Sequence, residues 1–187
     1  MNSEHTLTPS MQTVNWGRDL IQQLLLNVQG DSWWSQSIAD CIALGPTTSS
    51  LHLAIFVEPY LSLLMAGAKT IESRFSRNYV APFGLLKPGD IVLLKRAGAD
   101  VVGIARVGQV KFLERSDPSW NRLRDVYQDQ LCVTDNEFWD RVADSWFGSL
   151  IWFDHLKPIP SIECDKNDRR GWVVIKRASD QLALGFE

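Results

Sequence analysis

Residues 67–74 (Gly-Ala-Lys-Thr-Ile-Glu-Ser-Arg) place three polar side chains at alternating positions of a predicted strand. Side chains two apart on a strand share a face, so Thr70, Glu72 and Arg74 are expected to point into the same space. Lys69, at the start of the strand, can meet a phosphate, while Glu72 and Arg74 can hydrogen-bond the edge of a base. This spacing predicts a nucleotide pocket.

The same four residues allow two other interpretations. Glu72 and Arg74 can form an ion pair that closes a barrel, with Lys69 left in solvent. A glutamate beside a lysine can also act as a general base, provided that burial and Arg74 tune its pKa. Spacing alone leaves binding, structure and catalysis open.

Further basic and polar residues lie outside this segment and could serve a nucleic-acid site. Arg77 and Asn78 follow the strand directly, and Arg169 and Arg170 precede Trp172. Basic groups beside an aromatic ring suit a phosphate and a stacked base. Against this, Trp172 begins an apolar strand and fits a core position, and the two arginines share their loop with aspartates and can form a solvated charge cluster.

Several classes of chemistry find no support in the sequence. The three cysteines, Cys41, Cys132 and Cys164, are far apart and form no C-x-x-C pair. We therefore expect reduced thiols and no metal site. The histidines have no metal-ligand spacing, and His52, in an apolar strand, is expected to be structural. No Gly-rich phosphate loop is present, so no cofactor is predicted.

Composition indicates an ordinary globular protein, with 45% hydrophobic and 22% charged residues. No run of about 18 apolar residues occurs and no secretion signal starts the chain, so we expect a cytoplasmic protein that binds no membrane. The net charge of -3 argues against nonspecific wrapping of duplex DNA. Residues 51–115 nevertheless hold nine basic and five acidic residues, an excess that suits an anionic ligand.

Two amphipathic helices are predicted before residue 50, over 15–29 and 32–44. The cluster Gly-Pro-Thr-Thr-Ser-Ser at 45–50 then separates a helical extension, 1–50, from the main domain, 51–187. Trp16, Trp33, Trp34 and several leucines are too much apolar surface for a free tail. These helices must therefore pack on the main domain or form the interface of a homodimer or a protein partner.

The main domain alternates strands and helices, with no internal repeat. Helices are predicted over 58–68 and, as a consecutive pair, over 117–144, the second starting with a capping box at Thr134 and Glu137. Strands are predicted over 51–56, 70–75, 90–96, 101–112, 149–156 and 171–177. The fold class is therefore α+β.

The segment Gly67-x-Lys69-Thr70-Ile71-Glu72-x-Arg74, followed by Lys87-Pro88-Gly89-Asp90 and by a closing strand at 171–174, resembles the ASCH family of the PUA-like superfamily. The resemblance covers about two-thirds of the chain, and residues 1–50 fall outside it. It implies a small PUA-like β-barrel with flanking helices, preceded here by a helical extension. It also implies a cleft between barrel and helices that binds RNA or a nucleotide.

Some ASCH proteins are hydrolases, among them an amidohydrolase that acts on N4-acetylcytidine through a lysine, a threonine and a glutamate. Lys69 matches that lysine, but the position of the threonine is Glu72 here, and Thr70 lies in a different register. The leading hypothesis is thus an RNA- or nucleotide-binding module. The alternative is a ribonuclease or an amidohydrolase on a modified nucleoside, with Lys69 and Glu72 as catalytic residues.

Overall fold

The computed structural model describes residues 9–43, 47–166 and 169–178. The helices in these ranges are α1 Pro9–Val28, α2 Ser32–Ile42, α3 Tyr60–Met65, α4 Leu123–Leu131 and α5 Asn136–Ala143, with a 3-10 turn at Trp120–Arg122. The strands are β1 Leu51–Phe56, β2 Glu72–Ser76, β3 Ile91–Arg96, β4 Val101–Glu114, β5 Phe147–Ile162 and β6 Trp172–Lys176. None of the described helices is long and apolar enough to cross a membrane.

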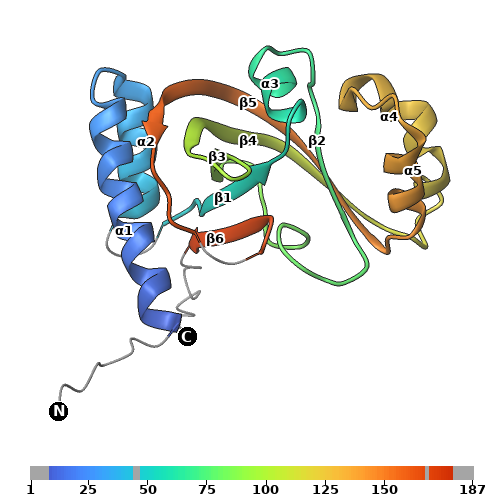
Figure 1. The fold of residues 1–187 in the computed structure, drawn as a ribbon, viewed down its shortest axis with the longest axis horizontal. Helices are drawn as coiled ribbons and strands as arrows, with labels where there is room; N and C mark the ends of the chain where they lie inside the picture. Colours follow the sequence, from blue (N-terminus) through green and yellow to red (C-terminus); the bar gives the residue numbers. More distant parts are fainter. Residues whose placement is uncertain (1–8, 44–46, 167–168, 179–187) are drawn as a thin grey trace, which may run out of the picture.

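The six strands form one curled sheet in the order β2-β5-β4-β3-β1-β6 (Figure 1). β1 and β3 run parallel, and the other neighbouring pairs are antiparallel. The long strands β4 and β5 pair along most of their length and extend from the α4–α5 end of the sheet to the α1–α2 end. The predicted α+β class and barrel-like sheet are confirmed.

Strand β5 is longer than predicted, because it continues from residue 156 through Pro158 and Pro160 to Ile162. Proline donates no hydrogen bond and is tolerated where one side of a strand has no neighbour. β2 pairs only with the first part of β5, Phe147–Ile151, so beyond it the strand has β4 on one side alone. The prolines therefore lie where a missing hydrogen-bond donor costs little, and the strand does not end at residue 156 as predicted.

The N-terminal helices pack on the sheet. Leu20, Leu24 and Ile38 are buried in one cluster with Leu53 and Leu93 of strands β1 and β3. Asp31 caps α2 by accepting a hydrogen bond from the Trp34 backbone N at 3.2 Å. Of the two fates predicted for this apolar surface, packing on the main domain is confirmed, while the partner interface and the boundary at residue 50 stay predictions.

Other helix boundaries differ from the sequence-based ones. α1 begins at Pro9 rather than at residue 15, although residues 9–14 lack apolar periodicity. α3 covers only Tyr60–Met65, inside the predicted 58–68. The expected cap at Thr134 is wrong by one residue, because the Asp135 carboxylate accepts from the Phe138 backbone N at 2.7 Å. Residue 44, the predicted end of the second helix, lies outside the described residues.

The aspartate of the Lys-Pro-Gly-Asp segment at 87–90 belongs to a buried network of hydrogen bonds. Asp90 is fully buried and accepts hydrogen bonds from the Ser50 and Lys87 backbone N atoms, at 2.7 and 2.9 Å. Its other neighbour is His52 Nε2 at 3.2 Å, and Trp172 Nε1 donates to His52 Nδ1 at 3.1 Å. His52 is thus a satisfied structural residue, as predicted, and Asp90 joins the start of β1 to β3.

Candidate functional site

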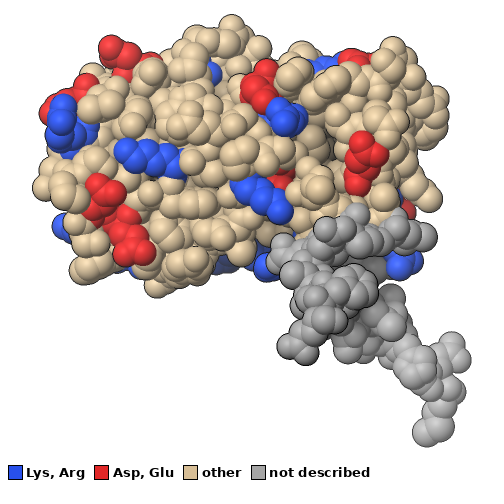
Figure 2. Space-filling view, turned by 180° about the vertical axis from the view of Figure 1, so that it is seen from behind, with Lys and Arg blue, Asp and Glu red and all other residues tan. Residues whose placement is uncertain are grey.

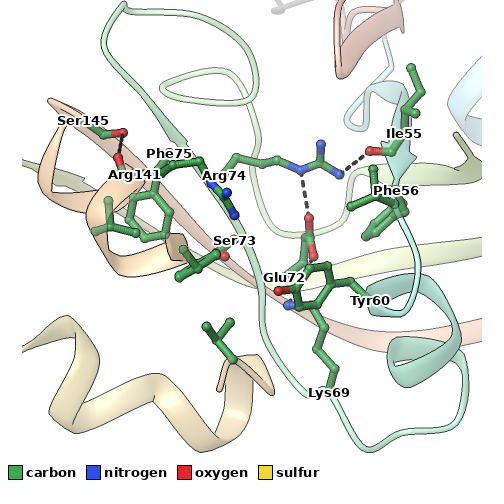
Figure 3. A pocket seen from close by; sticks show the side chains of 14 residues that line it. Ile55, Phe56, Tyr60, Lys69, Glu72, Ser73, Arg74, Phe75, Arg141 and Ser145 are labelled. Carbon is green, nitrogen blue, oxygen red and sulfur yellow. Dashed lines mark hydrogen bonds and ion pairs between the residues drawn. The ribbon is translucent and has the colours of Figure 1, made fainter. Parts of the chain in front are cut away.

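A pocket of about 300 Å³ lies between the ends of β1 and β2, the start of α3, and helix α5 (Figure 3). This volume falls at the lower end of the roughly 300–1,000 Å³ typical of small-molecule sites. Aromatic rings of Phe56, Tyr60, Phe75 and Phe138 contribute to its wall. The polar side chains in its lining are Tyr60, Lys69, Glu72, Ser73, Arg74, Arg141 and Ser145.

Glu72 is the centre of the polar part of the pocket. Its side chain is almost fully buried, and its two carboxylate oxygens face two different cations. Glu72 Oε1 lies 2.8 Å from Arg74 Nε, and Glu72 Oε2 lies 3.3 Å from Lys69 Nζ. Two cations stabilise the buried carboxylate, and each oxygen keeps capacity for a further donor.

Lys69 is also buried, which rules out the interpretation that left it in solvent. Its ammonium donates to the Ile71 carbonyl oxygen and lies 5.8 Å from the centre of the Tyr60 ring. Burial, with a smaller contribution from the Asp135 carboxylate, raises the pKa of the Tyr60 hydroxyl. Tyr60 is therefore a neutral hydrogen-bond donor at physiological pH.

Arg74 joins two edges of the curled sheet. From the edge strand β2, its guanidinium donates to the Ile55 carbonyl oxygen of β1 at 2.9 Å and to the Gly171 carbonyl oxygen, just before β6, at 3.3 Å. It also lies 4.9 Å from the Phe56 ring centre and 5.3 Å from that of Trp172. Arg74 thus bridges the two sides of the sheet through these carbonyl oxygens, and its ion pair with Glu72 of the same strand lines the pocket.

Three residues predicted for the site do not line the pocket. Thr70 is exposed and precedes β2, where its backbone N donates to the Gln130 carbonyl oxygen, so strand alternation does not place it beside Glu72. Arg77 is exposed and pairs with Asp144 at 2.8 Å. Asn78 is exposed, and its carbonyl oxygen accepts from the Ser76 hydroxyl at 2.6 Å.

The predicted C-terminal residues lie beside the pocket rather than in it. Arg169 and Arg170 line a different hollow, which shares only Ile55 with the pocket. Trp172 is buried, in agreement with the core interpretation, and touches the site through the Arg74 guanidinium. The structure thus brings Lys69, Glu72 and Arg74 together in one place and leaves the other predicted residues around it.

Sequence reasoning missed the contribution of α5 to the pocket. Phe138, Arg141 and Ser145 come from α5 and the turn after it, more than 60 residues beyond β2. The amphipathic spacing at 136–143 indicated a helix but not its partner. The Asp135 cap was the available signal, because it fixes where α5 starts and hence which face it presents to β2.

Charge is spread over the surface. On the face shown in Figure 2, basic and acidic side chains are interspersed, with no broad patch of one sign. Among the residues that the structure describes, no group of three or more histidine, cysteine or acidic side chains can hold a metal ion. The face shown in Figure 2 therefore offers no wide electrostatic surface to a ligand.

Comparison with solved structures decides the fold. A point variant of the ASCH protein from Zymomonas mobilis matches at 15% identity, with a TM-score of 0.50, over 64% of this chain and 77% of its own. The chain has an ASCH-like fold. The parent Zymomonas protein matches at 14% identity and a TM-score of 0.49, over 61% of this chain and 73% of its own.

The ASCH domain from Lactobacillus crispatus matches at 11% identity and a TM-score of 0.43, over 79% of this chain and 96% of its own. No family model and no curated protein sequence matches the chain. The fold expected from the Gly-x-Lys-Thr and Lys-Pro-Gly-Asp segments is therefore confirmed by structure alone. In this ASCH-like fold the pocket occupies the space between the barrel and helices α3 and α5, and none of the α1 and α2 residues whose side chains are described lines it.

Proposed function

We propose that the pocket binds the base of a nucleotide, presented as part of a single-stranded RNA. The observation that carries this proposal is the buried Glu72 carboxylate, held between Lys69 and Arg74 at one side of an aromatic pocket. Glu72 accepts hydrogen bonds, while Lys69 next to it donates them. An adjacent acceptor and donor match the edge of a base that offers an N–H group next to a carbonyl oxygen or ring nitrogen.

The aromatic wall suits the faces of the same ligand. Tyr60, Phe75 and Phe138 come from three different elements and converge on the pocket. Stacking on aromatic rings is the usual way in which proteins hold an unpaired base. Arg141 also lines the pocket with a largely exposed side chain, paired with Glu137 at 3.0 Å, and can exchange that partner for a phosphate.

A titration with two pocket variants tests the proposal. Glu72→Gln keeps the shape of the side chain and removes its charge, while Arg141→Ala removes a rim cation. We expect each to weaken binding of ribonucleoside monophosphates and of a mixed-sequence RNA heptamer by roughly tenfold, since hydrogen bonds to charged groups contribute about 1.5–3 kcal/mol. Calorimetry at low and physiological salt measures the affinity.

Arg124→Ala is the matched control, because Arg124 is an exposed arginine of α4 outside the pocket lining. Its affinity should equal that of the wild type. Wild-type protein that binds none of the four monophosphates and no RNA, or two folded pocket variants with unchanged affinity, contradicts the proposal.

A second candidate function is hydrolysis of an RNA or of an acylated nucleoside. The observation that favours it is the Lys69–Glu72 ion pair, buried yet part of the pocket lining. For the acylated nucleoside, Glu72 can take a proton from the water molecule that attacks the acyl carbonyl carbon and return it to the leaving amino group as the C–N bond breaks, while Lys69 can stabilise the oxyanion. Incubation with N4-acetylcytidine and with RNA, followed by chromatography, tests it, and turnover that persists in Glu72→Gln rules out this role.

A further inference from the structure

Three residues, Arg77, Trp146 and Arg115, form a row at the end of the sheet where β2 and β4 finish and β5 begins. Phe147 pairs with Ser76 of β2 on one side and with Glu114 of β4 on the other. Trp146, one residue earlier, donates its backbone N to the Ser76 carbonyl oxygen at 2.9 Å and accepts from the Arg115 backbone N at 2.8 Å. Arg115 therefore lies opposite Trp146 on one side, and on the other side Trp146 contacts Ser76, the residue before Arg77.

Trp146 is 57% exposed, more than any other tryptophan whose burial is described. The Arg115 guanidinium lies 5.4 Å from the centre of its ring. Arg77 is exposed and pairs with the equally exposed Asp144, two residues before Trp146. An exposed tryptophan with an arginine at its ring combines a stacking surface with a phosphate ligand.

Three acidic residues, Asp144, Asp117 and Glu114, lie near this row. Asp144 neutralises Arg77 only through a solvent-exposed pair, which a phosphate can replace. The Asp117 carboxylate already accepts from the Ser119 backbone N and hydroxyl, at 2.8 and 2.6 Å. Glu114 pairs directly with Phe147 and so shares the face opposite to that of Trp146.

The row begins where the pocket ends. Ser145 and Arg141 line the pocket, and Ser145 directly precedes Trp146 (Figure 3). On β2, Phe75 lines the pocket, and Arg77 follows just beyond the end of the strand. A chain that leaves the pocket along this side therefore passes over Trp146.

We propose that Trp146, with Arg115 at its ring and Arg77 beyond the end of β2, is a second base subsite, on which a neighbouring nucleotide of single-stranded RNA stacks. This inference rests on the proposed function of the pocket and extends it, because it makes an oligonucleotide the ligand rather than a free nucleoside. The base of one nucleotide enters the pocket, the adjacent base covers the exposed tryptophan ring, and the arginines contact the phosphates between and beyond them.

The test compares a short and a long ligand. Binding of the ribonucleoside monophosphates and of a mixed-sequence RNA heptamer is measured for the wild type, Trp146→Ala, Trp146→Phe and Arg115→Ala. We expect Trp146→Ala to weaken heptamer binding by roughly tenfold, since stacking on one aromatic side chain contributes about that much. Monophosphate binding should not change, and Trp146→Phe should restore most of the heptamer affinity.

Trp33→Ala serves as the control, because Trp33 is an exposed tryptophan of α2 at the opposite end of the sheet (Figure 1). Heptamer affinity equal to the wild type in Trp146→Ala overturns the subsite while leaving the pocket intact. An equal loss for monophosphates and heptamer also overturns it, since Trp146 would then act on the pocket itself. If the wild type binds neither ligand, the proposed function fails and the subsite fails with it.

Discussion

Arg74 has two roles that a single variant separates poorly. Its guanidinium connects β2 to the Ile55 and Gly171 carbonyl oxygens and at the same time faces Glu72 in the pocket. A loss of binding in an Arg74 variant could therefore come either from a missing ligand contact or from the loss of the bridge between β2 and the Ile55 and Gly171 carbonyl oxygens. Glu72 and Arg141 are better probes of the ligand, because neither bonds two edges of the sheet.

Arg74→Ala should lower the free energy of unfolding by about 2–4 kcal/mol, since it removes one partner of a largely buried charge network. Arg74→Lys should recover less than half of the loss, because a single ammonium cannot reach both carbonyl oxygens and the carboxylate. Urea unfolding measures the difference. Arg77→Ala, which removes a largely exposed ion pair, should change the free energy of unfolding by less than about 0.5 kcal/mol. An equal effect of the two alanine variants would refute the bridging role of Arg74.

The sequence largely predicted which side chains form the polar part of the pocket, but not how they are arranged. Alternation predicted that Glu72 and Arg74 share a face, and they pair, while Lys69, whose surroundings the spacing left open, lies beside Glu72. Thr70 was misplaced because alternation holds only inside a strand, and β2 starts two residues later. Arg141 was out of reach, because only the packing of α5 against β2 brings it to the pocket.

Among the elements, helix α2 is attached to the sheet by both apolar and polar contacts. Cys41 is buried in the cluster that α1 and α2 share with the sheet, and Lys157 of β5 pairs with the Asp31 cap. Trp33 stacks on His155 of β5 with ring centres 4.2 Å apart. A helix held at its cap, its buried face and its exposed ring has little freedom to detach alone.

Burial raises the pKa of the Cys41 thiol to about 11, from an ordinary value of 9.0. The unfolded chain therefore ionises first as pH rises, and the folded state loses stability between about pH 9 and pH 11. We expect the stability advantage of the wild type over Cys41→Ala to shrink by about 2 kcal/mol between about pH 8 and pH 10.5. Urea unfolding at both pH values measures it, and a constant difference would contradict the burial of this thiol.

At the scale of the whole molecule, two ends of one curled sheet have different neighbours. Helices α1 and α2 cover one end, and α4 and α5 cover the other, with the pocket at the α5 end (Figure 1). The fold class was predictable because turn residues and periodicity mark most elements. The length of β5 was not, because the sequence does not show that Pro158 and Pro160 lie beyond the last residue that pairs with β2.

The N-terminal helices and the barrel should unfold together, because they share one buried cluster. Leu24 of α1 is fully buried among Leu53 and Leu93 of the sheet, so Leu24→Ala should lower the free energy of unfolding by about 2–5 kcal/mol. Unfolding followed by circular dichroism and by tryptophan fluorescence should give one coincident transition in both proteins, with the midpoint lower in the variant.

The exposed Leu26 on the same helix provides the control, and Leu26→Ala should shift the midpoint very little. Two separate transitions, with the variant affecting only one, would mean that residues 1–50 form an independent unit attached to the barrel. A single transition means that the helices belong to the same cooperative core as β1 and β3. In that case their removal would destabilise the sheet that positions Glu72 and Arg74, even though no described side chain of α1 or α2 lines the pocket.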